Sequence, residues 1–117
     1  MKRSFLLFAS LLAAADRRPP LNQAPPKDAS RANPYEHHAD SQRAGRKLYL
    51  RECSSCHGER GEGGRHAPAL APSMDHAQPG AIFWVLRNGS LWRGMPSFSH
   101  LPEAQRWQII AYLKTMH

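Results

Sequence analysis

Apolar residues recur at helical spacing in three stretches of this chain, residues 39–51, 79–88 and 102–116. In each stretch they return every three or four positions, so they line one face of a helix and leave the opposite face to polar residues. The positions that define the apolar faces are Gly45, Leu48, Tyr49, Ile82, Val85, Leu86, Ile109, Tyr112 and Leu113. We therefore expect three helices, joined by irregular segments in which glycine and proline are frequent.

The first of these helices has two features that bear on function. Gly45 lies in its middle, where glycine costs about 1 kcal/mol relative to alanine, and this predicts that another backbone crosses close by. The opposite face carries four basic residues, Arg43, Arg46, Lys47 and Arg51. Such a face is either a solvated surface or a docking surface for an acidic partner, and the sequence leaves both interpretations open.

The chain begins with a short apolar run typical of a secretory signal peptide. Lys2 and Arg3 precede the apolar residues 4–12, and three alanines ending at Ala15 supply a cleavage site. The run is shorter than the roughly 20 apolar residues needed to span a bilayer, so we expect export to the periplasm with cleavage after Ala15. The alternative is an uncleaved segment that anchors the protein to the membrane through residues 4–15.

Residues 16–38 contain five prolines and few apolar side chains. Proline lacks a backbone N–H and favours extended geometry, so this segment predicts a disordered leader or a linker that acts as a spacer. The remaining residues, 39–117, form the one small domain that we expect in a chain of 117 residues.

One stretch, Cys53-Ser54-Ser55-Cys56-His57, contains both cysteines of the chain. Two cysteines separated by two residues and followed directly by histidine form the attachment pattern of c-type haem. The spacing lets both sulfurs reach the vinyl groups of one porphyrin, and the histidine can then bind the iron. A redox dithiol would be flanked by alternating strands and helices, and a structural zinc site would show a second Cys/His pair. We therefore expect one covalently attached haem c, held by Cys53 and Cys56 with His57 as an axial iron ligand.

Two residues after the motif are candidates to complete this site. The carbonyl of Pro68 is free to accept a hydrogen bond from the ring of His57, as an iron-binding histidine requires; the alternative is an ordinary turn proline. Met95, between a glycine and a proline, lies on an irregular loop and is the candidate for the second axial ligand. The rivals for that position are Met74 on another loop and the histidines His66, His76 and His100.

Taken together, residues 40–117 resemble a class I cytochrome c of the small bacterial monohaem kind. The motifs that carry the resemblance are Gly45 and Tyr49 at eight and four residues before Cys53, the Cys-x-x-Cys-His motif, Pro68-Ala69-Leu70, Gly94-Met95-Pro96, and the terminal segment Ile109-Ile110-Ala111-Tyr112-Leu113. The resemblance implies an all-α fold of a few helices wrapped around haem, with the terminal helix crossing the first near Gly45. It does not identify the residues that contact the propionates, for which Trp92, Arg87 and Arg93 are candidates by position.

With His57 and Met95 both on the iron, no coordination site is left for a substrate. We therefore expect a periplasmic electron carrier and not an enzyme, exchanging one electron at a time with redox proteins that carry an acidic docking patch. A membrane oxidase or a periplasmic dehydrogenase is a possible partner, and nucleic acid is not expected. The alternatives are a haem subunit of such a dehydrogenase or terminal oxidase and, if Met95 does not bind iron, a haem sensor with an open site.

Overall fold

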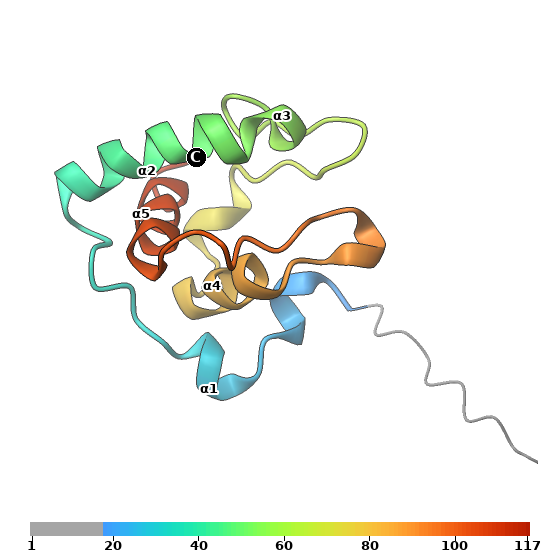
Figure 1. Ribbon diagram of the computed structural model, residues 1–117, viewed down its shortest axis with the longest axis horizontal. Coiled ribbons are helices and arrows are strands. Elements are labelled where there is room, and N and C mark those ends of the chain that lie inside the picture. The colour runs from blue at the N-terminus through green and yellow to red at the C-terminus, as the bar shows by residue number, and fades with distance from the viewer. Residues whose placement is uncertain (1–17) are drawn as a thin grey trace, which may run out of the picture.

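The computed structural model describes residues 18–117, so the expected signal peptide and its cleavage site lie outside the described residues (Figure 1). All regular elements of the described residues are helices, and their one β feature is an isolated antiparallel bridge between Ser90 and Met95. The elements in chain order are η1 (Pro20–Gln23), α1 (Pro26–Ala29), α2 (Ala39–Glu52), α3 (Ser54–His57), η2 (Ser73–Asp75), α4 (Pro79–Asn88), η3 (Leu91–Arg93) and α5 (Glu103–Leu113). The expected all-α fold is confirmed. Within the described part of the chain, no helix has the length and apolarity needed to cross a membrane.

The centre of the fold is the crossing of α2 and α5, which Figure 1 shows lying against each other. A Cβ atom built on Gly45 would overlap the backbone carbonyl of Gln108 in α5, so the expected close approach at this glycine is confirmed. Tyr49, Ile109 and Ile110 are completely buried at the crossing. The glycine therefore lets two backbones meet, and the apolar faces beside it form the core.

Helix α4 packs beside this crossing and supplies the second half of the core. It begins at Pro79, whose missing N–H costs nothing in a first turn, and it ends before Gly89, which adopts a φ of +70°. Phe83 of α4 stacks on Trp107 of α5, with ring centroids 4.1 Å apart and an angle of 20° between the rings. The three expected helices are thus present as α2, α4 and α5, and α4 has the predicted bounds.

The last helix ends earlier than its apolar pattern predicts. It stops at Leu113, and the next side chain, Lys114, donates its amine to the carbonyls of Asp75 and Ala77 at 2.6 and 2.7 Å. Met116, two residues further on, is buried in the core. The chain end is therefore fixed to the segment around η2 by these contacts.

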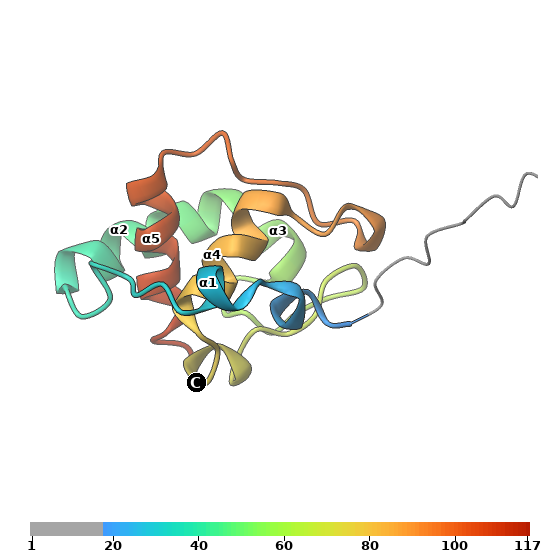
Figure 2. The ribbon, with the colours of Figure 1, turned by 90° about the horizontal axis from the view of Figure 1, so that it is seen from below.

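Residues 20–38 are helical in part and lie against the domain, unlike the extended leader that the prolines suggest. Helix α1 lies against α4, and the chain then runs past the start of α5 to reach α2 (Figures 1 and 2). Leu21 and Tyr35 pack against the core, and the Asn33 amide donates to the carbonyl of Trp107 at 2.8 Å. These few apolar and polar anchors are enough to hold a proline-rich segment on the surface, because proline loses little conformational entropy when it is fixed.

Candidate functional site

The end of α2 and the single turn of α3 bring the two cysteines and the histidine together. Cys53 ends α2 by donating its N–H to the carbonyl of Tyr49 at 2.8 Å, and its own carbonyl accepts from the N–H of His57 at 3.0 Å. The two thiols are free, with Cys53 partly buried and Cys56 exposed. The sequence motif therefore folds into one compact turn that presents two thiols and an imidazole.

The two thiols lie in different surroundings. Burial, helped by the neighbouring Glu52 and by Cys56, raises the pKa of the Cys53 thiol to about 12. At neutral pH this thiol is protonated and a poor nucleophile on its own. The site is therefore unlike that of a redox dithiol, which needs a thiolate stabilised by positive charge.

A loop that folds back on itself carries Pro68 to the histidine. The N–H of Gly63 donates to the carbonyl of His57 at 2.7 Å, and Leu70 donates to the carbonyl of Gly61 at 2.7 Å. Gly63 has a φ of +81°, and a Cβ atom there would lie 2.5 Å from the backbone nitrogen of Ala69. The glycine-rich run after the motif thus serves to bring a second stretch of backbone alongside the first.

As a result, Nδ1 of His57 lies 2.9 Å from the carbonyl oxygen of Pro68. A carbonyl oxygen can only accept, so Nδ1 is the protonated nitrogen and Nε2 keeps its lone pair. This is the contact that the sequence predicted for Pro68, and it leaves the half-buried imidazole with one nitrogen ready to bind a metal. The iron-binding role of His57 belongs to the proposal below.

Met95 lies at the base of a short hairpin. Ser90 and Met95 exchange two backbone hydrogen bonds of 2.9 and 3.1 Å, and Gly94 takes the left-handed conformation that the turn needs. The side chain of Met95 is half-buried against the core, whereas its rival Met74, like Met116, is buried within the core. Among the described methionines, Met95 is therefore the one with a thioether at the margin of the core. The histidines His66, His76 and His100 are all exposed.

The three candidates for propionate contacts lie at the surface, and the guanidinium of Arg93 lies over the ring of Trp92 at 5.6 Å from its centroid. Arg87 points its guanidinium to Asp28, at 3.3 Å, and Arg93 donates to the carbonyl of Arg18 at 3.2 Å. The side chain of Trp92 is 65% exposed beside Leu91, which is 75% exposed. The structure thus gives each of these residues a surface position.

Tyr49 contributes to the site in a way that the helical pattern did not suggest. Its ring is completely buried at the crossing, and its hydroxyl donates to the carbonyl of Gly58, directly after the motif, at 2.6 Å. Burial is the main cause that raises the pKa of this phenol to about 12. The signal was available in the sequence, because a tyrosine on the apolar face of a helix needs a hydrogen-bond partner when it is buried.

This donor set fits a covalently attached haem. Two thiols on one turn can form the thioether links of a c-type haem, and an imidazole with a free Nε2 and a thioether at the core margin can serve as its axial ligands. In the described residues, no three side chains among the histidines, cysteines and carboxylates gather as they would around a zinc ion. Cys53, Cys56, His57 and Met95 would hold the group, with Pro68 behind the histidine.

Comparisons with known proteins agree with the fold and class of a c-type cytochrome. The family model described as "Cytochrome C oxidase, cbb3-type, subunit III" matches residues 40–113. A comparison with curated protein sequences gives no match.

Two of the solved structures that share the fold are cytochromes cL. The protein from the marine methylotrophic bacterium Methylophaga aminisulfidivorans MPT is 24% identical with a TM-score of 0.60, covering 69% of this chain and 56% of that one. The protein from Hyphomicrobium denitrificans is 23% identical with a TM-score of 0.56, covering 79% of this chain and 62% of that one. The present chain therefore spans less than two thirds of either relative, and the likeness confirms the expected cytochrome c fold.

The family match covers α2, α3, α4 and α5 together with both loops that bear the candidate ligands. The chain therefore belongs to the cbb3-type oxidase subunit III family of c-type cytochromes.

Proposed function

We propose that the protein is a periplasmic one-electron carrier with a single haem c linked to Cys53 and Cys56 and ligated by His57 and Met95. The observation that carries the proposal is the 2.9 Å contact between His57 Nδ1 and the Pro68 carbonyl, on the same turn as two free thiols. When bound, a haem with two axial ligands supplies reversible one-electron chemistry and leaves no site open for a substrate. The expected export signal at residues 1–15 supports the location.

The chain's own residues set the properties of this centre. The Pro68 carbonyl fixes the tautomer and the orientation of the His57 ring and raises its basicity as a ligand. The thioether of Met95 is a soft ligand that favours the reduced state and raises the potential. The bridge between Ser90 and Met95 limits how far this ligand can move when the charge changes, and small structural change favours rapid electron exchange.

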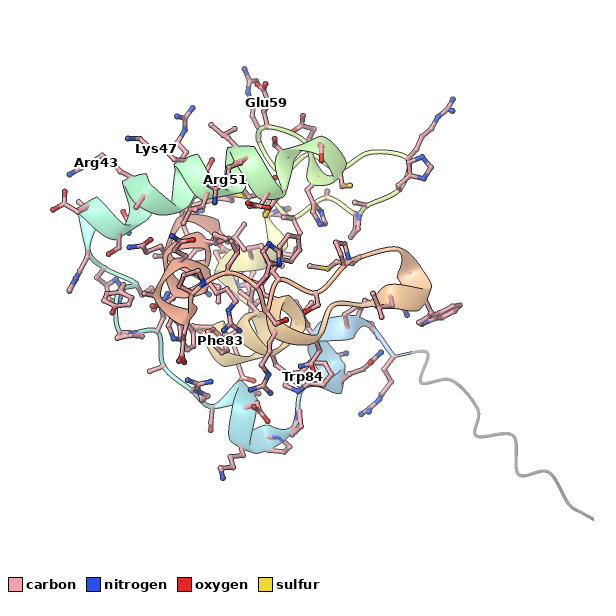
Figure 3. All side chains as sticks on the ribbon, viewed as in Figure 1. Arg43, Lys47, Arg51, Glu59, Phe83 and Trp84 are labelled. Atoms are coloured by element: carbon pink, nitrogen blue, oxygen red, sulfur yellow. The ribbon has the colours of Figure 1, made fainter. Side chains whose placement is uncertain are left out.

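Two surfaces are available to a redox partner. Figure 3 shows Arg43 and Lys47 projecting from the outer side of α2, although Arg43 already pairs with Asp40. Leu91 and Trp92 are exposed close to Met95 in the chain, and no carboxylate occurs between Asp75 and Glu103. We propose that an acidic partner docks by weak, salt-dependent contacts, as suits rapid exchange.

A second candidate function is that of a haem subunit in a larger complex. The family to which the chain belongs is described as a subunit of cbb3-type cytochrome c oxidase, and this observation favours an oxidase as the complex. In that case the domain would pass electrons within an assembly. Isolation from native membranes in mild detergent separates the two functions: a free carrier elutes alone, and a subunit elutes with oxidase activity.

The ligand assignment is tested on protein from a host that matures c-type haem. A pyridine haemochrome spectrum and intact mass should show one haem with two thioether links. The ferrous protein should resist carbon monoxide, Met95→Ala should bind it, and the control Met74→Leu, altered inside the core, should resist like the wild type. Free thiols in native protein would overturn the proposal as a whole. Immediate binding of carbon monoxide by the wild type would overturn the role of Met95 and favour an open-site haem sensor.

A further inference from the structure

We propose that residues 18–38 form a strap that holds the Met95 hairpin in position, with Asp28 and Arg31 as positioning residues. The Met95 hairpin is defined here as residues 89–98. The inference rests on the proposed role of Met95 as an iron ligand. It concerns a segment that precedes the family match at residues 40–113.

The first step is the seat of the strap on α4. Gly80, in the first turn of α4, is buried, and a Cβ atom there would overlap the carbonyl of Asp28 and lie 2.7 Å from that of Ala29. Only glycine allows the backbones of α1 and α4 to approach this closely. The contact between α1 and α4 therefore depends on Gly80, and the atoms nearest to a Cβ atom built there all belong to the strap.

The second step leads from the strap to the hairpin through Arg87. Its guanidinium donates to the Asp28 carboxylate at 3.3 Å, and its carbonyl accepts from the hydroxyl of Ser97, two residues after Met95. The adjacent carbonyl of Leu86 accepts from the N–H of Phe98 at 2.7 Å. The last turn of α4 is therefore held by the strap on one side and holds the hairpin on the other.

The third step fixes α4 to α5. The guanidinium of Arg31 lies over the rings of Phe83 and Trp107, at 4.6 and 5.3 Å from their centroids. It also donates to Glu103, in the first turn of α5, at 2.7 Å. One arginine of the strap thus ties α4, to which the hairpin is hydrogen-bonded, to α5, by cation–π contacts and an ion pair.

The strap also reaches the hairpin directly. Arg93 donates to the carbonyl of Arg18 at 3.2 Å, and the Gln23 amide donates to the same carbonyl at 2.7 Å. The strap therefore contacts the hairpin directly through Arg18. It also supports the base of the hairpin through Asp28 and Arg87. Both contacts restrain the segment that carries Met95.

The experiment uses the full-length, haem-loaded protein and three single variants. Gly80→Ala forces α1 away from α4, Asp28→Asn weakens the pair with Arg87 without changing its size, and Lys27→Gln is the matched control at an exposed neighbour on α1. Two readouts are measured on each: hydrogen exchange of the amides of Ser90, Met95 and Phe98, and the rate of carbon monoxide binding to the ferrous protein. Haem content and thermal unfolding are recorded in parallel.

We expect Gly80→Ala to raise both rates about tenfold and Asp28→Asn to raise them about fivefold, within the usual range of coupling between sites. Lys27→Gln should match the wild type, and haem content should stay constant. Faster exchange confined to residues 18–38, with carbon monoxide binding unchanged, would show a strap that only stabilises the fold and would overturn the inference.

Failure of the proposed function gives a different result. Wild-type protein that carries haem but binds carbon monoxide at once lacks Met95 ligation, and the strap's role toward Met95 falls with it. Wild-type protein that resists carbon monoxide while the strap variants behave identically leaves the electron carrier intact and overturns the strap alone.

Discussion

The crossing of α2 and α5 and the loops that carry the candidate ligands are built in different ways. At the crossing, side chains such as Tyr49 and Ile110 are completely buried around Gly45. In the loops, Cys53 and Met95 are only half-buried, and the positions of these side chains are set by backbone hydrogen bonds and by glycines at positive φ. The first region is held by packing and the second by backbone geometry.

This difference indicates how each region responds to change. A packed crossing cannot accommodate a larger side chain without moving two helices, so a substitution there lowers the stability of the whole domain. A loop held by a few hydrogen bonds can shift locally, so a substitution there alters the geometry of the site while the helices stay folded. Substitutions of glycine in the two regions test this distinction.

The largest effect is expected from Gly45→Ala. On an exposed helix this change would stabilise by about 1 kcal/mol, but here the new methyl group would overlap the Gln108 carbonyl. We expect a loss of about 3 kcal/mol or more in the free energy of unfolding, because backbone must move. Denaturant unfolding followed by far-UV dichroism measures it.

The control is Gly64→Ala in the ligand loops. A Cβ atom on Gly64 would lie 3.4 Å from the carbonyl oxygen of Cys56, an ordinary contact, and its backbone does not require glycine. This variant should unfold within about 0.5 kcal/mol of the wild type. Equal stability of the two variants would show that the crossing is not the rigid region.

Gly63→Ala should affect the site more than the fold. Its φ of +81° and its close approach to Ala69 oppose any side chain, at a cost of about 2 kcal/mol. We expect the fold-back to open and the contact between Pro68 and His57 to be lost. In haem-loaded protein this should shift the midpoint potential and the resonance of the His57 Nδ1 proton. An unchanged potential would mean that Pro68 does not tune the histidine.

Tyr49→Phe tests the side chain that spans both regions. It keeps the buried ring but removes the hydrogen bond to Gly58, for an expected loss of about 1 kcal/mol. The phenol pKa of about 12 adds a test by pH. A raised pKa stabilises the fold below the ordinary pKa of about 10, and this contribution is lost as the pH rises toward 12. Wild-type stability should therefore fall more over this interval than that of the variant, as measured by urea titrations.

The sequence allowed the helices and the chemistry of the site to be predicted for clear reasons. Helix α4 has its predicted bounds, because a proline and a glycine mark its ends and its apolar spacing is regular. The close approach at Gly45 followed from the cost of glycine in a helix, and it is confirmed. The contact between Pro68 and His57 followed from what an iron-binding imidazole needs.

What the sequence did not reveal depends on contacts between residues far apart in the chain. The packing of residues 20–38 depends on Arg31 meeting Phe83 and Trp107, and on Asn33 reaching a carbonyl in α5. No local pattern indicates such partners, whereas the prolines around them indicate an extended chain. The early end of α5 also depends on a distant contact, because the Lys114 amine donates a hydrogen bond to a carbonyl of η2.

The smallest effect is expected at the ion pair between the strap and α5, which belongs to neither region of the comparison. The hydrogen bond from Arg31 lowers the pKa of the Glu103 carboxyl. A lowered pKa stabilises the fold above the ordinary carboxyl value of about 4.3, and this contribution is lost as the pH falls through the folded-state pKa. Because the carboxylate is exposed, the loss should be small and screened by salt. Hydrogen exchange at pH 3 and pH 6, corrected for intrinsic rates, should show the strap loosening at the lower pH, and Glu103→Gln should reduce the difference. If the crossing loosened together with the strap, the strap would be part of the packed core and would need to be grouped with α2 and α5.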